Sequence, residues 1–418
     1  MVKVGLDARG ALVAFRAVPP QIDESKGPWP DPDWNVLLRE AGLDPSRLSP
    51  SGSKWLPPAL ADARAEWDGS FKNQPDVPIH VTAAAHHGRP VYFEVLGPWN
   101  RPLRMQEARP AAGLLVRQAA FVFLVLSVLV AALIFARRNL RLGRGDRRGA
   151  LRVSIFELLL ALLAWLVSAH HMTGMAQELD AFSVAGGLAL FIGVFVWLTY
   201  MALEPYVRRR WPDLLISWTR LLSGGFRDPL VGRDLLIGVL FGGVRAAVLH
   251  ASNGLAFFLD LPGMTPSPAE SSMLASPRLL VASLLTASWV SVIQSLSIMA
   301  LLILGWVILR KRWLAMAVAG LVMGLLALSG ENYAVELPAA FAFAAVSIFV
   351  AARFGILALT ASTLTAVLLM GTPLTLDFSR WYAGRSFFVI LVLAGIAFYG
   401  FWTSLGGKSP FGAEALQE

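Results

Sequence analysis

Long uninterrupted apolar runs begin at Leu114 and continue almost to the C-terminus, and they constrain the fold more than any other feature. A helix needs about 20 apolar residues to cross a hydrocarbon core of roughly 30 Å. By that measure the sequence predicts about nine membrane spans: Leu114–Ala136, Ser154–Ala169, Phe182–Leu203, Leu235–Leu259, Leu279–Leu309, Trp313–Leu328, Leu337–Ala352, Phe354–Met370 and Ser386–Leu405. The second, sixth and seventh are short, whereas the fifth would be about 46 Å long as a straight helix and is either tilted or broken.

Composition supports lipid as the main solvent of this chain. Of its 418 residues, 56% are hydrophobic and 15% are charged, and the mean hydropathy is +0.59, which is too apolar for an ordinary soluble domain. The predicted fold class is therefore a membrane all-α protein. A polytopic helical bundle at residues 114–405 follows a small N-terminal α+β extracytoplasmic domain at residues 1–113, and residues 406–418 form a cytoplasmic tail.

Basic residues indicate the orientation, because Lys and Arg accumulate in short cytoplasmic loops. The loops after spans one, three, five, seven and nine carry Arg137, Arg138, Arg141, Arg144, Arg147, Arg148, Arg152, Arg208, Arg209, Arg210, Arg220, Arg227, Arg233, Arg310, Lys311, Arg312, Arg353 and Lys408. The intervening loops carry only Arg278, Arg380 and Arg385. The C-terminus is therefore expected in the cytoplasm, and nine spans would leave residues 1–113 outside.

The charge distribution excludes some partners. Residues 1–113 hold equal numbers of basic and acidic side chains, so the net charge of +8 comes from the membrane half. We expect anionic lipid headgroups as partners of the Arg clusters, and no nucleic acid. Cysteine is absent, so no disulfide supports the N-terminal domain and no thiolate site exists.

The N-terminal domain has patterns typical of two hairpins and one helix. The expected elements are a hairpin turning at Asp7–Gly10, a helix capped by Asp31 or Asp33 that contains Trp34, Leu37, Leu38 and Ala41 and stops at Gly42, a linker at Ser49–Pro58, and a second hairpin turning at His86–Pro90. Residues 1–20 do not resemble a signal peptide. We therefore expect that a further membrane span precedes this chain, which would make it a fragment of a longer protein.

Three stretches resemble the membrane region of bacterial transmembrane serine/threonine protein kinases. They are Arg137–Gly149, Glu204–Asp234 and Trp381–Ser386. The resemblance covers nearly the whole chain. It implies a bacterial inner-membrane location and an upstream kinase domain with a first span. No kinase motif is present here, neither the Gly-rich loop nor the His-Arg-Asp and Asp-Phe-Gly segments, so no catalytic residue can be carried over. A kinase domain or a second copy of the chain would be the protein partner.

An amphipathic helix is expected near residues 212–223. Leu214, Leu215, Trp218, Leu221 and Leu222 share one helical face, and Asp213, Ser217 and Arg220 fill the opposite face. We expect this helix in the cytoplasmic interface. It is either a docking or lipid-sensing lever, or simply a connector covering the underside of the bundle.

A candidate polar site lies within the membrane. Arg245 is the most unusual residue in any span, because polar groups at membrane depth are costly and often functional. Gln294 should lie at a similar depth, so a contact between these two is expected, with Glu157 as an alternative partner. His250 and Asn253 lie toward the outer end of the same span. The site is either a substrate or ion pathway, or one interhelical hydrogen bond.

Other features are interpreted as structural. The pairs Gly238/Gly242 and Gly320/Gly324 have the spacing that allows close helix packing. The adjacent histidines His86-His87 and His170-His171 could bind a metal, but no neighbouring carboxylate spacing accompanies them. No metal, cofactor or catalytic residue is predicted. The preferred function is a non-catalytic membrane sensor or anchor module of a kinase-like signalling protein. The alternatives are a multi-pass small-solute transporter and, third, an intramembrane enzyme.

Overall fold

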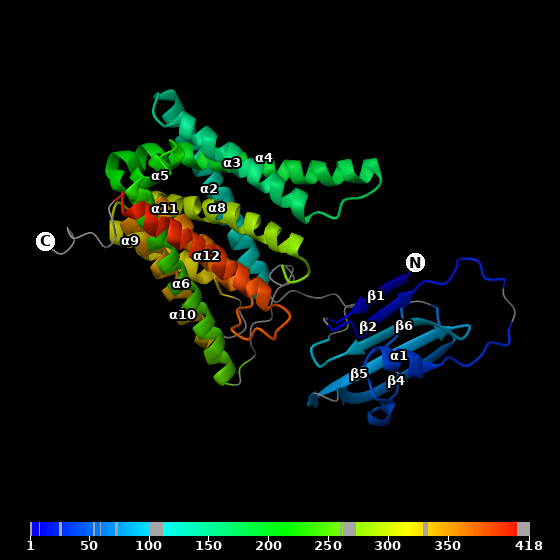
Figure 1. The fold of residues 1–418 in the computed structure, drawn as a ribbon. Helices are drawn as coiled ribbons and strands as arrows, with labels where there is room; N and C mark the ends of the chain where they lie inside the picture. The colour runs from blue at the N-terminus through cyan, green and yellow to red at the C-terminus, as the bar shows by residue number, and fades with distance from the viewer. Residues whose placement is uncertain are drawn as a thin grey trace. The chain divides into compact units, whose positions relative to one another are not determined.

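The computed structural model describes residues 2–7, 9–24, 27–52, 55–58, 60–71, 74–100, 112–259, 261, 273–328 and 333–407. The chain divides into two compact units, Met1–Arg109 and Pro110–Glu418, and each is treated by itself (Figure 1). Most of the expected C-terminal tail, including Lys408, lies outside the described residues.

The N-terminal unit is built on one antiparallel sheet of six strands in the order β1-β2-β6-β5-β4-β3. The strands are β1 (Val2–Leu6), β2 (Leu12–Ala17), β3 (Ser49–Pro50), β4 (Ala63–Phe71), β5 (Gln74–His86) and β6 (Arg89–Leu96). Both predicted hairpins are confirmed, since β1 pairs with β2 and β5 pairs with β6. Strand β4 was not predicted, and the expected linker contains β3.

The core of this unit lies between one helix and one face of the sheet. Helix α1 (Trp34–Glu40) begins after Asp33, whose side chain accepts a hydrogen bond from the Asn35 N–H. Gly42 follows with φ +67°, a conformation that glycine adopts without strain. The buried apolar side chains of α1 and the following turn pack on the alternate residues of β5 and β6; they are Leu37, Leu38, Ala41, Leu43, Leu48, Ile79, Val81, Ala83 and Phe93. The predicted helix and its caps are therefore confirmed.

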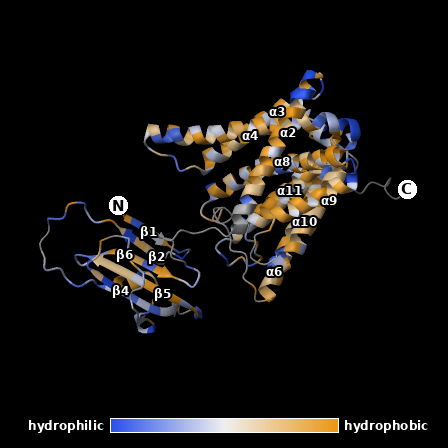
Figure 2. Cartoon of the chain, turned by 180° about the vertical axis from the view of Figure 1, so that it is seen from behind, coloured by the Kyte–Doolittle hydropathy of each residue, from blue (hydrophilic) through white to orange (hydrophobic). Residues whose placement is uncertain are grey.

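The second unit is helical. Its helices are α2 (Ala112–Arg141), α3 (Arg147–Ser168), α4 (Met175–Arg210), α5 (Ile216–Leu222), α6 (Pro229–Phe258), α8 (Pro277–Leu309), α9 (Arg312–Leu326), α10 (Tyr333–Phe354), α11 (Ile356–Gly371) and α12 (Ala383–Ser404), with a 3₁₀ turn at Pro212–Leu214 between α4 and α5. Many large apolar side chains on these helices are exposed, including Phe123, Val184 and Phe257. Figure 2 shows that hydrophobic residues extend along the helices.

Among the described residues, seven helices are long and apolar enough to cross a membrane, namely α2, α3, α4, α6, α8, α10 and α12. This fits a multi-pass membrane protein. Helices α9 and α11 are apolar but have only 15 and 16 residues, or about 24 Å at most. The expectation that the second and seventh spans are short was wrong, because α3 and α10 each have 22 residues. Helix α8 runs unbroken over 33 residues.

The loops with many basic residues meet at one end of the bundle, here called the basic end. Four contacts join segments there. The Asp146 N–H donates to Glu204 at 3.2 Å, and the guanidinium carbon of Arg312 lies 5.3 Å from the centre of the Trp211 ring. Gly355 packs on the Leu214 carbonyl, and Gly232 packs on Ser404. At the opposite end, Arg278 donates to the Ala169 carbonyl at 2.7 Å. Helices α8 to α12 therefore alternate in direction, α9 and α11 included.

Candidate functional site

Arg245 lies in the interior of the bundle at the contact between α6, α10 and α11. Its side chain is 2% exposed. Nη1 donates to Ser362 Oγ at 3.3 Å and to Thr363 Oγ1 at 3.1 Å. The guanidinium carbon also lies 4.2 Å from the centre of the Phe343 ring, close enough for a cation–π interaction. Neutral hydroxyls and an aromatic face thus surround this cation.

The expected contact between Arg245 and Gln294 was wrong. Gln294 is exposed on the surface of α8, whereas Arg245 is buried and its partners come from α10 and α11. Glu157 lies on α3, which packs against α4 and α8, and it forms no ion pair with Arg245 in the part of the chain that the structure describes.

The other two residues of the predicted site, His250 and Asn253, do not contact Arg245 in the part of the chain that the structure describes. His250 and Asn253 are exposed near the end of α6, and His250 Nε2 lies 3.3 Å from the Leu369 carbonyl. Ser362 and Thr363 were missed by sequence reasoning. The only signal for them was the run of small hydroxyl side chains in α11, between Thr360 and Thr365.

The close approach of α6 and α11 positions Arg245 against these hydroxyls. A Cβ added at Gly238 would lie 2.3 Å from Ala361 Cβ, and one at Gly242 would lie 2.4 Å from Thr365 Cβ. Such distances are far below van der Waals contact. The predicted packing role of Gly238 and Gly242 is confirmed. It leaves Arg245 enclosed, with its Nε atom lacking a hydrogen-bond partner among the described residues.

The segment between α4 and α6 is a 3₁₀ turn followed by the short helix α5, rather than the single helix expected over residues 212–223. Leu214, Leu215 and Trp218 are buried in the main core of the bundle, and Leu221 and Leu222 are half-buried. Ser217 is also buried, so the expectation that it lies on the polar face was wrong. We call residues Pro212–Leu222 the connector.

The connector packs against helices that are far apart in the sequence. Arg152 of α3 donates to the Leu222 carbonyl at 2.8 Å. Gly355, between α10 and α11, has φ +91°, and a Cβ there would lie 2.2 Å from the Leu214 carbonyl oxygen. Only glycine fits this position, for both conformational and steric reasons. The connector therefore holds the ends of several helices at the basic end.

Further buried polar side chains lie at the basic end. Asn139 donates to the Met201 carbonyl at 2.9 Å, and Glu204 pairs with Arg208 at 2.5 Å. The hydroxyl of Tyr200 and the indole N–H of Trp218 are buried and interact with each other. Buried polar groups cost free energy unless they are hydrogen-bonded, and a satisfied network favours one particular packing arrangement.

One further buried polar group lies deeper in the bundle. Both carboxyl oxygens of Glu157 on α3 are buried and lack a hydrogen-bond partner among the described residues.

Comparison with known proteins adds no assignment to any of these sites, because no family model, curated protein or solved structure matches this chain.

Proposed function

We propose that this chain is the non-catalytic sensor and anchor module of a membrane signalling protein of the serine/threonine-kinase type. In this proposal the bundle crosses a bacterial inner membrane nine times, the basic end faces the cytoplasm, and the N-terminal unit lies outside. The positive-inside rule supports this orientation, because the basic loops meet at a single end of the bundle.

The observation that carries the proposal is the meeting of two distant sequence stretches at the basic end. Residues 137–149 and 204–234 are the longest stretches that resemble the kinase membrane region. In the structure, Asp146 of the first stretch contacts Glu204, the first residue of the second, and Asn139 contacts Met201, just before it. The connector belongs to the second stretch. The two longest of the three stretches thus meet at one packed junction.

This junction suits the transmission of a signal between the bundle and a cytoplasmic domain. The connector contacts α3, α4, α6 and the start of α11, so a shift of any of these helices would move it. A signal requires two states that differ in ligand affinity. The exposed arginines of the same end would bind anionic headgroups, each contributing on the order of 1 kcal/mol near the membrane surface.

The first test is to purify the full chain from its native membranes and to measure phosphotransfer from radiolabelled ATP. We expect a protein kinase to be fused to the chain or to co-purify with it. Arg152→Gln, which removes the hydrogen bond to Leu222, should change phosphotransfer at normal protein abundance. Arg148→Gln is the matched control, since Arg148 is exposed on the same helix. Absence of any kinase, or equal phosphotransfer in both variants and wild type, would count against the proposal.

A transporter is the second candidate, and one observation favours it. Helix α11, which supplies the hydroxyl partners of Arg245, also lines a hollow of about 430 Å³ together with α6 and α12. The side chains with hydroxyl groups in its lining are Thr360, Thr365 and Tyr399. The test is uptake of a small solute by proteoliposomes that contain the chain. Uptake that is lost in Arg245→Leu but kept in Gln294→Leu would support transport in place of signalling.

A further inference from the structure

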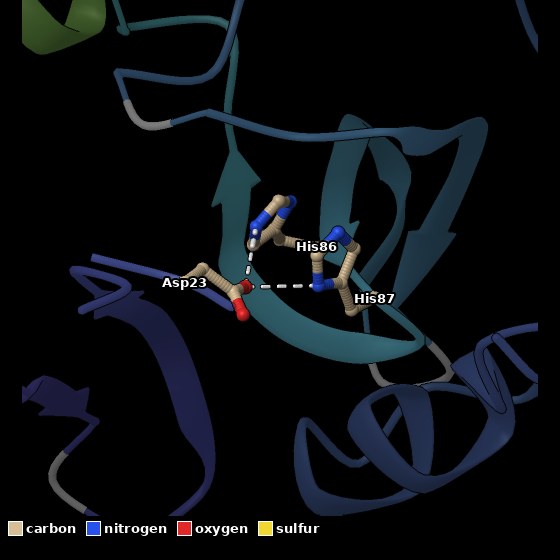
Figure 3. A group of neighbouring side chains, drawn as sticks. All are labelled: Asp23, His86 and His87. Atoms are coloured by element: carbon tan, nitrogen blue, oxygen red, sulfur yellow. Dashed lines mark ion pairs between the residues drawn. The ribbon is translucent and has the colours of Figure 1, made fainter. Parts of the chain in front are cut away.

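Two adjacent histidines lie at the hairpin between β5 and β6, beside carboxylates from distant parts of the N-terminal unit. His86 is the last residue of β5, and His87 begins the two-residue loop before β6. Asp23 comes from the segment between β2 and α1, and Asp62 directly precedes β4. Figure 3 shows the carboxylate of Asp23 directed toward both imidazole rings.

The distances around Asp23 match those of a small metal site. Its Oδ2 atom lies 3.0 Å from His87 Nδ1 and 3.6 Å from His86 Nε2. Asp23, His86 and His87 each offer one ligand atom, and these three atoms all lie within 4.8 Å of one another. Zinc bonds of about 2.0–2.1 Å separate neighbouring tetrahedral donors by about 3.3 Å. Side-chain rotations that open the angle between the two stacked rings would therefore bring all three donors onto one ion.

Asp62 occupies the opposite edges of the same two rings. Its Oδ2 atom lies 3.6 Å from His86 Nδ1 and 3.9 Å from His87 Nε2, and it accepts the His87 N–H at 2.7 Å. In metal sites the second nitrogen of a ligating histidine is usually held by a carboxylate, a backbone carbonyl or a water molecule, which fixes the tautomer and the ring orientation. His86 Nδ1 is buried without a hydrogen-bond partner among the described residues, so a slight approach of Asp62 would complete this pattern.

The backbone explains how adjacent histidines can face one ion. His87 has φ +54° and Gly88 has φ +72°, a turn that Asn-Gly usually forms. This conformation folds the His87 ring back against His86, with ring centroids 3.8 Å apart. Trp29 stacks on His87 at 4.3 Å. Because His86 and Trp29 cover the faces of the His87 ring, only its edges are free to bind a ligand. These edges carry the nitrogens and point at Asp23 and Asp62.

We propose that Asp23, His86 and His87 bind a divalent transition-metal ion of the zinc class, and that Asp62 orients both imidazoles from the outer shell. Three protein ligands leave at least one coordination position open for water or for a further ligand. The site depends only on the geometry of the N-terminal unit and goes beyond the proposed signalling function, so either can fail without the other.

His80 provides a matched control in the same sheet. It also lies between two carboxylates, with Nδ1 2.6 Å from Asp68 and Nε2 2.9 Å from Glu66. These carboxylates bind opposite edges of one ring, so three donors do not converge on a point. His80 has the same residue types around it but should not hold the ion.

The test uses the full chain in nanodiscs, stripped with chelator and dialysed against buffered Zn²⁺, with bound metal measured by mass spectrometry. We expect one ion per chain in wild type and in His80→Gln. Asp62→Asn should weaken binding about 10- to 100-fold, and Asp23→Asn and His87→Asn should weaken it by more. Asn tolerates positive φ, so His87→Asn keeps the turn, which circular dichroism would verify.

Co²⁺ spectroscopy gives a second measurement, which reports the coordination geometry of the bound ion. Intense visible absorption of the Co²⁺-loaded chain, typical of tetrahedral coordination, should appear in wild type and in His80→Gln and vanish in His87→Asn. The proposal would be overturned if the wild-type chain bound no Zn²⁺. It would also be overturned if folded His87→Asn and Asp23→Asn chains bound Zn²⁺ as tightly as His80→Gln.

Discussion

Replacing Gly242 by alanine should destabilise the bundle and release Arg245 from its partners. The added Cβ would lie 2.4 Å from Thr365 Cβ and 2.6 Å from the Ser362 carbonyl oxygen. To restore ordinary contact, α6 and α11 must separate locally by about 1 Å. Overpacking of this kind costs about 1–3 kcal/mol.

The same separation would lengthen the hydrogen bonds of Arg245, which lies one turn along α6. Its bonds to Ser362 and Thr363 are already 3.3 and 3.1 Å, so an increase of about 1 Å would break them. Loss of a hydrogen bond to a charged group adds about 1.5–3 kcal/mol. Counting the overpacking and one such hydrogen bond, we expect a total loss of about 2.5–6 kcal/mol in the free energy of unfolding.

Gly243→Ala is the matched control, because a Cβ at Gly243 meets nothing within 4 Å. It should be neutral, or stabilising by up to about 1 kcal/mol through helix propensity. Unfolding of the full chain in mixed micelles with increasing denaturing detergent, followed by circular dichroism, measures both variants. Equal stability of the Gly242 and Gly243 variants would refute the close packing of α6 on α11.

Two further predictions concern single polar groups. Glu157→Leu should raise the free energy of unfolding by about 1–3 kcal/mol, because it removes a buried carboxyl group without partners; a loss of stability in the same assay would mean that Glu157 has a stabilising role. The hydrogen bond with Glu178 raises the pKa of His171, helped by the Leu166 carbonyl. The stabilising effect of His171 is therefore full below its unfolded pKa of about 6.5 and is lost as pH rises through the higher folded pKa. The melting temperature of wild type relative to His171→Gln should fall over that window, and a difference independent of pH would contradict this.

Short-range sequence patterns correctly predicted helix α1 and the two hairpins, because interactions within a few residues determine these elements. Asp33 caps α1 and Gly42 ends it through interactions within a few residues, and the two hairpins follow from short turns. Strand β4 was missed because its mixed pattern becomes a strand only by pairing with β5 along its whole length. The lengths of α3 and α10 were underestimated because both helices begin before the apolar run, α3 at Arg147 and α10 at Tyr333.

The candidate sites depend on distant contacts that sequence spacing does not reveal. Depth along α6 and α8 suggested that Arg245 and Gln294 meet, but depth does not fix the direction in which a side chain points around the helix axis. Similarly, His86-His87 lacks a nearby carboxylate in the sequence. Asp23 and Asp62 reach the pair only because the sheet brings their segments to the hairpin.

The most direct test of the proposed module is the side of the membrane on which each unit lies. The chain has no cysteine, so single substitutions can be labelled without background. Arg64→Cys is exposed in the N-terminal unit, and Arg148→Cys is exposed at the basic end. In intact spheroplasts, a membrane-impermeant maleimide should label Arg64→Cys at once and Arg148→Cys only after permeabilisation. Labelling of both from the same side would contradict a module that joins an outer domain to a cytoplasmic junction.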